Sequence, residues 1–304
     1  MRSMAEFIKN KCPSDECAVA LGYFDGIHVG HAAVLRCAIE AAKSIDAASY
    51  ALTFDMSALR ASGKGGKDLL PRDESQRIAQ NMGIDSFLTL NFGTIAHMGG
   101  EEFVCEVLMK LLKARVICCG SDFRFGKNRS CGVAELRAIC GSQKIETIVA
   151  EPVFVGEEIV STSKIKAMIG CGDVEKAALM LGRAYGMALR VTHGKRLARN
   201  LGFPTINQVL PSTIVEPRHG VYRSKCTVGK KVYFGVTNVG LRPTVECSEV
   251  VTLETHLLDF CGDLYGDIVH TSLDGFMRDE QKFSGVDELR AAVLRDIDTV
   301  RHGA

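Results

Sequence analysis

The first half of the chain alternates short apolar runs with longer amphipathic stretches. The apolar runs have the length of buried strands and cover residues 18–21, 49–54, 86–92, 115–120 and 146–150. The stretches between them repeat their apolar positions at helical spacing, over residues 31–42, 73–82, 101–112 and 132–140. This alternation predicts a doubly wound α/β domain, in which a parallel sheet is covered on both faces and binds its ligand at the carboxyl ends of its strands.

The pattern changes near residues 181–185. Downstream, short turns separate β-rich runs at residues 222–228, 232–236, 251–258 and 268–273, which favours a small antiparallel barrel or sandwich. A last helix over residues 286–300 has an apolar face large enough to cover the β domain, made of Leu289, Val293, Leu294 and Ile297. We therefore predict an α/β domain over residues 1–184 and a β domain with a C-terminal helix over residues 185–304.

The composition limits the classes of binding partner and the cellular compartment that we expect. The 304 residues suit two domains, and 37 basic against 36 acidic residues give no reason to expect a nucleic acid or an anionic membrane as partner. The N-terminus has no apolar stretch long enough for a secretory signal, and no run approaches the ~18 apolar residues of a spanning helix, so we expect a cytoplasmic protein. The 12 cysteines are scattered without a Cys-x-x-Cys, which favours buried reduced thiols over disulfides.

The segment with the most chemistry lies between the first strand and the first helix and reads Gly-Tyr-Phe-Asp-Gly-Ile-His-Val-Gly-His over residues 22–31. Its glycines permit a sharp turn and a close approach of ligand to backbone. The start of a helix attracts anions, and His28 and His31 could donate hydrogen bonds to phosphate oxygens there and, when protonated, offset charge on a leaving group. The alternative to phosphate binding is that the two histidines are only a pair of surface residues. Zinc is the other rival, but no third ligand follows at a standard spacing.

Two more strand ends carry polar segments. Residues 120–129 place Asp122, Arg124, Lys127 and Arg129 around two phenylalanines, a composition that also fits a solvated loop. Residues 161–166, Ser-Thr-Ser-Lys-Ile-Lys, open the next helix. Their hydroxyls and lysines suit a triphosphate, or the hydroxyls act only as helix caps.

In the β domain the notable segment covers residues 193–207 and ends in Gly-Phe-Pro-Thr-Ile-Asn. A turn followed by a strand start explains the glycine and the proline. Thr205 and Asn207 are alternate residues of an extended chain, so their oxygens face the same side. There they could hold a magnesium ion and phosphate oxygens.

Together these motifs resemble the bacterial bifunctional riboflavin kinase/FAD synthetase family, and the resemblance spans nearly the whole chain. The run at residues 22–31 resembles the signature of the family's nucleotidyltransferase domain, and residues 120–126 resemble its Gly-x-Asp-Phe-Arg-Phe-Gly element. Residues 161–166 resemble its Ser-Ser-Thr-Arg-Ile-Arg turn, with lysines where arginines are usual. Residues 202–207 resemble the Pro-Thr-Ala-Asn element of riboflavin kinases.

The resemblance implies a role for each matching residue. It makes His28 and His31 catalytic in the first domain and Glu254 the general base of the kinase, with Thr205 and Asn207 as ligands of Mg²⁺ and with Arg278 and Glu280 on the flavin side. The implied nucleotide-binding residues are Gly22, Phe24, Asp25, Gly26, Gly30, Asp122, Arg124, Ser161, Thr162, Ser163 and Lys164 in the first domain and Gly194, Arg199, Gly220 and Tyr222 in the second. Residues 220–222 and 235–244 resemble nucleotide-side loops of the kinase.

The implied function is the conversion of riboflavin to FMN and of FMN to FAD, with ATP as co-substrate, by a monomer or weak homo-oligomer. One departure matters: where the family usually continues Thr-Phe-x-Pro-His-Pro, residues 53–57 read Thr-Phe-Asp-Met-Ser. A riboflavin kinase with a degenerate first domain is therefore the alternative, and Ala198 also replaces a usual glycine. A non-catalytic flavin or nucleotide sensor is a further reading, against which Glu254, Thr205 and Asn207 argue.

Overall fold

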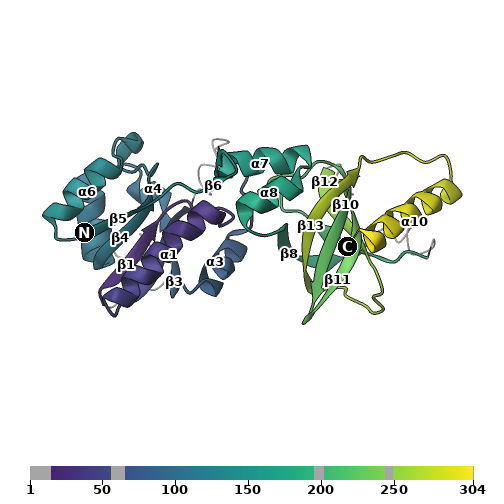
Figure 1. Ribbon diagram of the computed structural model, residues 1–304, viewed down its shortest axis with the longest axis horizontal. Helices are drawn as coiled ribbons and strands as arrows, with labels where there is room; N and C mark the ends of the chain where they lie inside the picture. Colours follow the sequence, from purple (N-terminus) through teal and green to yellow (C-terminus); the bar gives the residue numbers. More distant parts are fainter. Residues whose placement is uncertain (1–14, 56–65, 195–201, 244–248, 304) are drawn as a thin grey trace. The chain divides into compact units, whose positions relative to one another are not determined.

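The computed structural model describes residues 15–55, 66–194, 202–243 and 249–303 (Figure 1). Internal contacts divide the chain into two compact units: Met1–Gly66 with Arg72–Ser161, and Lys67–Pro71 with Thr162–Ala304. The helices α7 (Thr162–Cys171) and α8 (Val174–Leu181) are thus counted with the second unit. The domain boundary expected between residues 184 and 185 stays a prediction.

The first unit contains the predicted doubly wound sheet. Its five strands are all parallel and lie in the order β3-β2-β1-β4-β5, with β1 (Cys17–Leu21), β2 (Ala48–Asp55), β3 (Ser86–Asn91), β4 (Ala114–Gly120) and β5 (Glu146–Ala150). From β1 the chain first builds outward through β2 and β3, then returns to add β4 and β5 on the other side. The carboxyl ends of β1 and β4 therefore form the switch point where open α/β sheets bind ligands.

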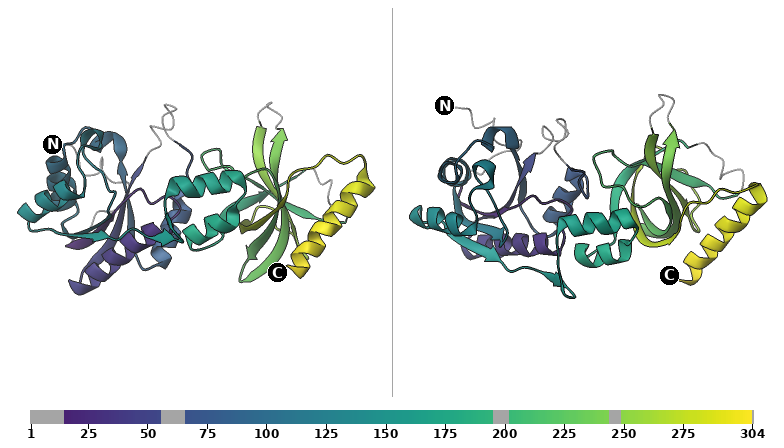
Figure 2. Two further views of the ribbon diagram at one scale, coloured as in Figure 1. Left: turned by 45° about the horizontal axis from the view of Figure 1, so that its top comes forward. Right: turned by 90° about the horizontal axis from the view of Figure 1, so that it is seen from above.

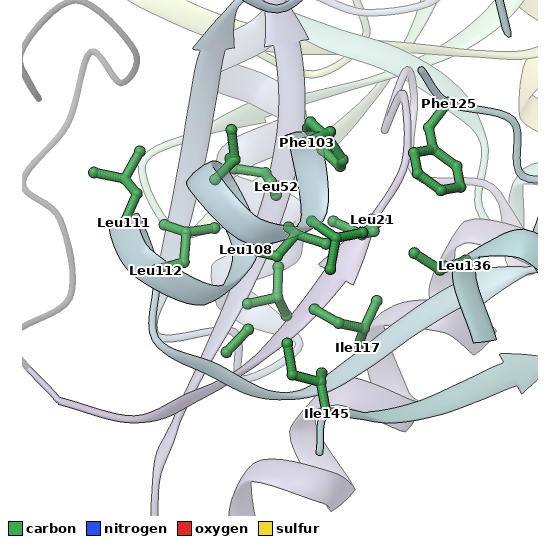
Figure 3. Packing of buried hydrophobic residues seen from close by; sticks show 14 of the residues in the cluster. Leu21, Leu52, Phe103, Leu108, Leu111, Leu112, Ile117, Phe125, Leu136 and Ile145 are labelled. Carbon is green, nitrogen blue, oxygen red and sulfur yellow. The ribbon is translucent and has the colours of Figure 1, made fainter. Parts of the chain in front are cut away.

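Helices cover both faces of this sheet. The side chains of β1 alternate: Ala18 and Ala20 face the helices α1 (Val29–Ser44) and α3 (Arg72–Asn81), and their small size lets α1 approach closely. On the other face Leu21 packs with residues of η2 (Phe103–Leu111) and α6 (Val133–Ser142) (Figure 3). The residues of this second cluster labelled in Figure 3 are Leu21, Leu52, Phe103, Leu108, Leu111, Leu112, Ile117, Phe125, Leu136 and Ile145.

The predicted helix at residues 101–112 forms with a different winding. It begins as the short α5 (Gly100–Glu102) and continues as η2, a nine-residue π-helix. Its apolar residues recur three and four positions apart, a pattern that does not distinguish the two windings. Smaller elements complete the unit: α4 (Phe92–Ile95), η3 (Lys127–Arg129), β6 (Phe154–Val155) and β7 (Glu158–Ile159).

The second unit contains a closed antiparallel barrel, which decides between the two β architectures left open by the sequence. Around the barrel the strand order is β10-β11-β12-β9-β8-β13. These strands are β8 (Tyr185–Thr192), β9 (Thr205–Val209), β10 (Gly220–Val228), β11 (Lys231–Pro243), β12 (Glu249–Leu257) and β13 (Ile268–Arg278). Closure leaves no free edge, so every strand has two neighbours to fix its register.

Strands β11 and β13 are longer than predicted. Residues 220–222 and 235–243, which belong to the segments that resemble nucleotide-side loops, form parts of strands, and residue 244 lies outside the described residues. A Cβ at Gly235 would lie 2.9 Å from the Thr255 methyl group, and one at Gly240 would collide with the Glu280 carboxylate. These glycines allow close packing within the barrel and do not mark turns.

The interior of the barrel is partly polar, and this fixes strand β9. The Gln208 side chain is fully buried and donates from Nε2 to the carbonyls of Leu189 and Val269, at 2.8 Å each. Its Oε1 accepts from the Thr271 hydroxyl at 2.7 Å. A buried amide whose donors and acceptor are all used holds its strand in one register, so Asn207 beside it is held on the opposite face.

The C-terminal helix α10 (Val286–His302) packs along the outside of the barrel, as predicted (Figure 2). Its inner face contains the buried Ala292 and Val300 with the partly buried Ile297. The prediction for Leu294 is wrong, because this side chain is 49% exposed. Position 294 follows Val293 directly and so points about 100° away from the packed face.

Candidate active sites

The β1–α1 junction is a tight loop that strand β2 and helix α3 both contact. The Gly22 amide donates to the Leu52 carbonyl of β2 at 3.2 Å, and the Gly26 amide donates to the Ser75 hydroxyl of α3 at 3.3 Å. Gly26 has φ +73° and Ile27 φ +41°, so the chain turns through left-handed backbone here. Asp25 and His28 are 5% and 6% exposed. The loop is therefore packed against its own sheet and presents an ordered backbone.

Helix α1 begins at Val29, two residues before the predicted start, and His28 is its N-cap. The His28 Nδ1 accepts a hydrogen bond from the His31 amide at 3.1 Å. Since Nδ1 accepts, the neutral His28 ring carries its proton on Nε2 and offers a donor there. The His28 and His31 rings stack with centroids 3.7 Å apart, at the N-terminus of a 16-residue helix.

His31 is held neutral. Its Nδ1 is buried without a hydrogen-bond partner among the described residues, and the edge of the Phe24 ring packs against it with centroids 5.5 Å apart. Burial lowers the pKa of His31 well below its usual range, the nearby His28 lowers it further, and a hydrogen bond with the Asp25 backbone opposes both effects. The one N–H of the neutral ring serves that bond to the Asp25 backbone, so His31 can donate from Nδ1 to an anion only after it gains a proton there.

Two glycines of the loop make room for these rings. A Cβ at Gly30 would lie 3.1 Å from the His28 ring, and one at Gly22 would lie 3.0 Å from the Phe24 ring. Both contacts are closer than a real Cβ tolerates without movement of its neighbour. The glycines thus allow the aromatic and imidazole rings to pack against the backbone. We call residues 22–31 the histidine site.

The segment after β4 starts beside the histidine site, because Leu21 pairs with Cys119. Its Phe123 and Phe125 rings lie 5.8 Å apart, and Phe125 exchanges backbone hydrogen bonds with Cys131. The polar side chains predicted to bind nucleotide, Asp122 and Arg124, are exposed. A nucleotide-binding role for Asp122 and Arg124 stays a prediction.

The predicted phosphate-binding turn is divided between the units. Ser161 is the last residue of the first unit, while Thr162, Ser163 and Lys164 form the first turn of α7 in the second unit. The helix therefore opens where the sequence predicts. A place for these four residues in the histidine site stays a prediction.

In the barrel, cross-strand register collects the predicted kinase residues on one face. Glu254 of β12 pairs with Asn207 of β9 on one side and with Asn238 of β11 on the other. Thr205 lies two residues before Asn207, on the same face, and pairs with His256. Directly paired residues have neighbouring side chains, so a carboxylate lies beside two amides. We call Thr205, Asn207 and Glu254 with their neighbours the barrel site.

Asn207 carries a buried oxygen suited to a cation. The residue is 5% exposed, and its Oδ1 has no hydrogen-bond partner among the described residues. The Nδ2 lies 3.5 Å from the Thr205 hydroxyl. Gly194 packs closely against this amide, since a Cβ at Gly194 would lie 2.5 Å from both Oδ1 and Nδ2 of Asn207. A buried carbonyl oxygen next to a hydroxyl oxygen is the hard donor set that Mg²⁺ prefers, so these residues fit the ion.

The flavin-side residues have defined partners. Arg278 makes a two-point ion pair with the buried Asp296 of α10, Nε to Oδ1 at 3.1 Å and Nη2 to Oδ2 at 2.7 Å. The Glu280 carboxylate accepts from the Asn238 amide at 3.1 Å. Because Asn238 pairs with Glu254, the Asn238 side chain lies between Glu280 and the expected base. Arg278 anchors the C-terminal helix, and its flavin contact stays a prediction.

The remaining nucleotide residues of the barrel have structural roles. Tyr222 is fully buried, donates its hydroxyl to the Arg218 carbonyl and packs edge-on against Phe276. Burial raises its pKa. A Cβ at Gly220, where φ is +149°, would lie 2.5 Å from the Arg278 carbonyl oxygen. Their nucleotide contacts stay predictions, and Arg199 lies outside the described residues.

Sequence reasoning missed Ser75, Asn238 and His256 as members of these sites. Ser75 holds the Gly26 amide from a separate helix, and nothing in the sequence near Ser75 signals that contact. Asn238 and His256 become visible only through the barrel register. Asn238 lies within residues 235–244, which resemble the family, and His256 lies two residues after the expected base, so pairing information would have identified both.

Within the described ranges there is no cluster of three or more histidine, cysteine or acidic side chains placed to hold a metal ion. No helix in those ranges is long and apolar enough to cross a membrane. The ten cysteines that the structure describes are all free thiols. Burial raises the pKa of Cys118 to about 12, so that thiol stays protonated.

Comparison with known proteins assigns a family to both halves. A model of the FAD synthetase family matches residues 10–164, and a model of the riboflavin kinase family matches residues 181–303. The bifunctional riboflavin kinase/FMN adenylyltransferase of Escherichia coli K12 is 31% identical over 296 residues, 96% of this chain and 94% of its own. The Pseudomonas fluorescens enzyme of the same name is 31% identical over 287 residues, 94% and 92% of the two chains.

A crystal structure from Streptococcus pneumoniae, described as a macrolide-efflux protein, matches 96% of both chains with a TM-score of 0.85 and 28% identity. It supports the same fold along the whole length. Because the family models cover both halves and curated relatives are 31% identical over nearly the whole chain, this chain belongs to the bifunctional riboflavin kinase/FMN adenylyltransferase family.

Proposed function

We propose that the barrel site phosphorylates riboflavin to FMN and that the histidine site transfers an adenylyl group from ATP to FMN, giving FAD and pyrophosphate. The observation that carries the proposal is the pairing of Glu254 with Asn207, whose buried Oδ1 lacks a partner among the described residues. A base thus lies next to donors for a cation. We further propose that the protein works in the cytoplasm as a monomer or weak homo-oligomer.

At the barrel site the acceptor is a primary alcohol, the ribityl 5′-hydroxyl, which is a weak nucleophile near neutral pH. Glu254 accepts its proton as the oxygen attacks the γ-phosphorus of ATP. Thr205 and Asn207 would hold Mg²⁺, which when bound offsets the negative charge of the phosphates. Glu280 and Asn238, joined by their hydrogen bond, line the approach to Glu254 from the flavin side.

At the histidine site the acceptor is already an anion, because FMN presents its phosphate, and no base is needed. Catalysis here requires alignment of that phosphate with the α-phosphorus and stabilisation of the departing pyrophosphate. The amides of the first turn of α1, the Nε2 donor of His28 and a protonated His31 supply donors for that purpose.

The family assignment favours both activities over a kinase with a degenerate first domain, because the FAD synthetase model matches residues 10–164. The chain nevertheless has Asp-Met-Ser where relatives are expected to have x-Pro-His-Pro, and Met56 and Ser57 lie outside the described residues. Adenylylation must therefore proceed without that histidine, which leaves His28 and His31 to supply the imidazoles.

The experiment that tests the proposal measures the two reactions separately on one preparation. Riboflavin with ATP and Mg²⁺ should yield FMN and then FAD, and FMN with ATP and Mg²⁺ should yield FAD and pyrophosphate, all followed by chromatography. Removal of Mg²⁺ with a chelator should stop both reactions. A preparation that makes FMN but no FAD or pyrophosphate would show that only the kinase operates.

Gly194→Ala should lower FMN formation by at least about tenfold, because the added methyl group must displace the Asn207 side chain from the barrel site. FAD formation from added FMN should stay unchanged. Gly170→Ala on α7 is the matched control, since a Cβ there meets nothing within 4 Å. If both alanine variants make FMN at the parent rate, Gly194 does not set the position of Asn207.

A further inference from the structure

We propose that His256 is a positioning residue of the barrel site that holds Thr205 in place through the backbone of Pro204. The inference rests on the proposed kinase function, because it assigns a role toward the Thr205 hydroxyl. His256 lies two residues after Glu254 on β12 and pairs directly with Thr205. It therefore lies on the same face as the base and the expected cation ligands.

The His256 side chain contacts two residues of the segment that leads into Thr205. Its Nδ1 lies 2.9 Å from the Pro204 carbonyl oxygen. A carbonyl oxygen only accepts, so Nδ1 carries a proton and donates. The edge of the Phe203 ring packs against the imidazole, with centroids 5.7 Å apart and an interplanar angle of 82°. One side chain thus holds both residues that precede Thr205.

The contact of His256 with Pro204 matters because Thr205 lies at the end of the pairing of β9 with β12. The pairing of β9 with β12 stops at Thr205 and His256, and the pairing of β9 with β8 covers only Asn207 and Gln208. Among the described strands, Thr205 therefore has a paired neighbour on one side only, whereas Asn207 has one on each side. The His256 side chain extends the attachment by one residue, beyond the last backbone pair.

The two expected cation ligands are therefore held in place by different contacts. Asn207 is fixed by β8, β12 and Gly194. Thr205 is fixed by β12 and by the bond from His256 to Pro204. Loss of that bond should let the Thr205 hydroxyl move and weaken the binding of the metal and the phosphates. The proton transfer to Glu254 should change little once Mg²⁺ saturates the site.

The test compares His256→Leu, which lacks the donor, with His256→Asn, whose amide nitrogen can replace Nδ1 at the same distance from the backbone. His256→Phe keeps a ring against Phe203 and also lacks the donor. We measure FMN formation over a range of Mg²⁺ concentrations with the full-length protein. The Leu and Phe variants should need about tenfold more Mg²⁺ for half-maximal rate, with kcat at saturation within about threefold of the parent. The Asn variant should need the parent concentration.

The outcomes separate the inference from the function on which it rests. A parent that makes no FMN overturns the kinase function, and the role of His256 with it. A parent that makes FMN while the Leu, Phe and Asn variants share one Mg²⁺ dependence overturns the positioning role alone. A fall in kcat at saturating Mg²⁺ without a change in Mg²⁺ dependence also overturns it. A parent-like thermal unfolding curve shows that the barrel of each variant is folded, and FAD formation from added FMN does the same for the first unit.

Discussion

Glu254→Gln should reduce FMN formation from riboflavin by at least about 100-fold, because general-base catalysis typically contributes 10²–10⁴-fold. Glutamine has nearly the same shape and keeps one side-chain oxygen, but its amide cannot take up the hydroxyl proton. The neighbours of Glu254 across the strands, Asn207 and Asn238, are neutral amides. The substitution therefore removes the one carboxylate from this row and preserves its packing.

The comparison that isolates this effect uses the second reaction of the same chain. FAD formation from added FMN needs no base and should stay at the parent rate in Glu254→Gln. Glu288→Gln on α10 provides a matched control, since that carboxylate is exposed and caps only Ser284. The base assignment fails if Glu254→Gln makes FMN as fast as the parent. A parallel loss of both reactions would indicate a folding defect instead.

The strands and helices followed from local pattern, but the barrel site did not. Thr205 and Asn207 are two residues apart, so an extended chain was enough to place their oxygens on one side. Their pairing with Glu254 depends on the register between β9 and β12, which β10 and β11 separate along the sequence. Without the resemblance, Glu254 could not have been preferred over Glu246 or Glu249. Register is a property of the closed barrel as a whole.

The errors have a common physical origin. Residues 235–244 resemble a loop of the family, yet residues 235–243 belong to a strand in which Gly235 and Gly240 allow close packing against Thr255 and Glu280. Leu294 was assigned to the buried face because it is apolar, although it is a single position away from that face. In both cases the local sequence suggested an environment, and the tertiary contacts decided it.

The histidine site was identified as a motif, but its internal organisation needed the structure. The sequence placed both imidazoles at the start of a helix and could not say that one ring caps it. His28 uses Nδ1 for the His31 amide and stacks on the His31 ring. Ser75 reaches the loop from α3, a contact between segments far apart in the chain that local pattern cannot reveal. Two roles, capping and phosphate binding, therefore meet in His28.

His31→Ala should lower FAD formation from FMN by at least about 100-fold while FMN formation stays at the parent rate. The alanine variant retains the backbone amide that His28 caps and loses only the imidazole beside it.

His28→Asn tests the other ring separately. Asparagine is a good N-cap, so it should preserve helix α1, whereas His28→Ala also loses about 0.5–2 kcal/mol of capping stability. FAD formation should fall in both His28 variants, and the melting temperature should fall in His28→Ala alone.

The lowered pKa of His31 adds a pH signature to this prediction. In the empty site the ring is neutral near pH 7, because burial and His28 oppose its protonation. A bound triphosphate adds negative charge, which raises the pKa of His31 and favours uptake of a proton. ATP should therefore bind this site more tightly as the pH falls through the region between the raised and the lowered pKa. Binding at pH 6.5 should be accompanied by proton uptake.

Calorimetric titration of ATP into the full-length protein, in two buffers of different ionisation enthalpy, measures that uptake directly. The barrel site also binds ATP, so the informative quantity is the difference between the parent and His31→Ala, which should lose the uptake that belongs to the histidine site. His97→Ala, with an exposed imidazole in the same unit, should behave as the parent. Equal proton uptake in the parent and His31→Ala would mean that the buried imidazole stays neutral when ATP binds. His31 would then contribute no charge to the bound triphosphate, and the pH dependence of FAD formation would have to come from another group.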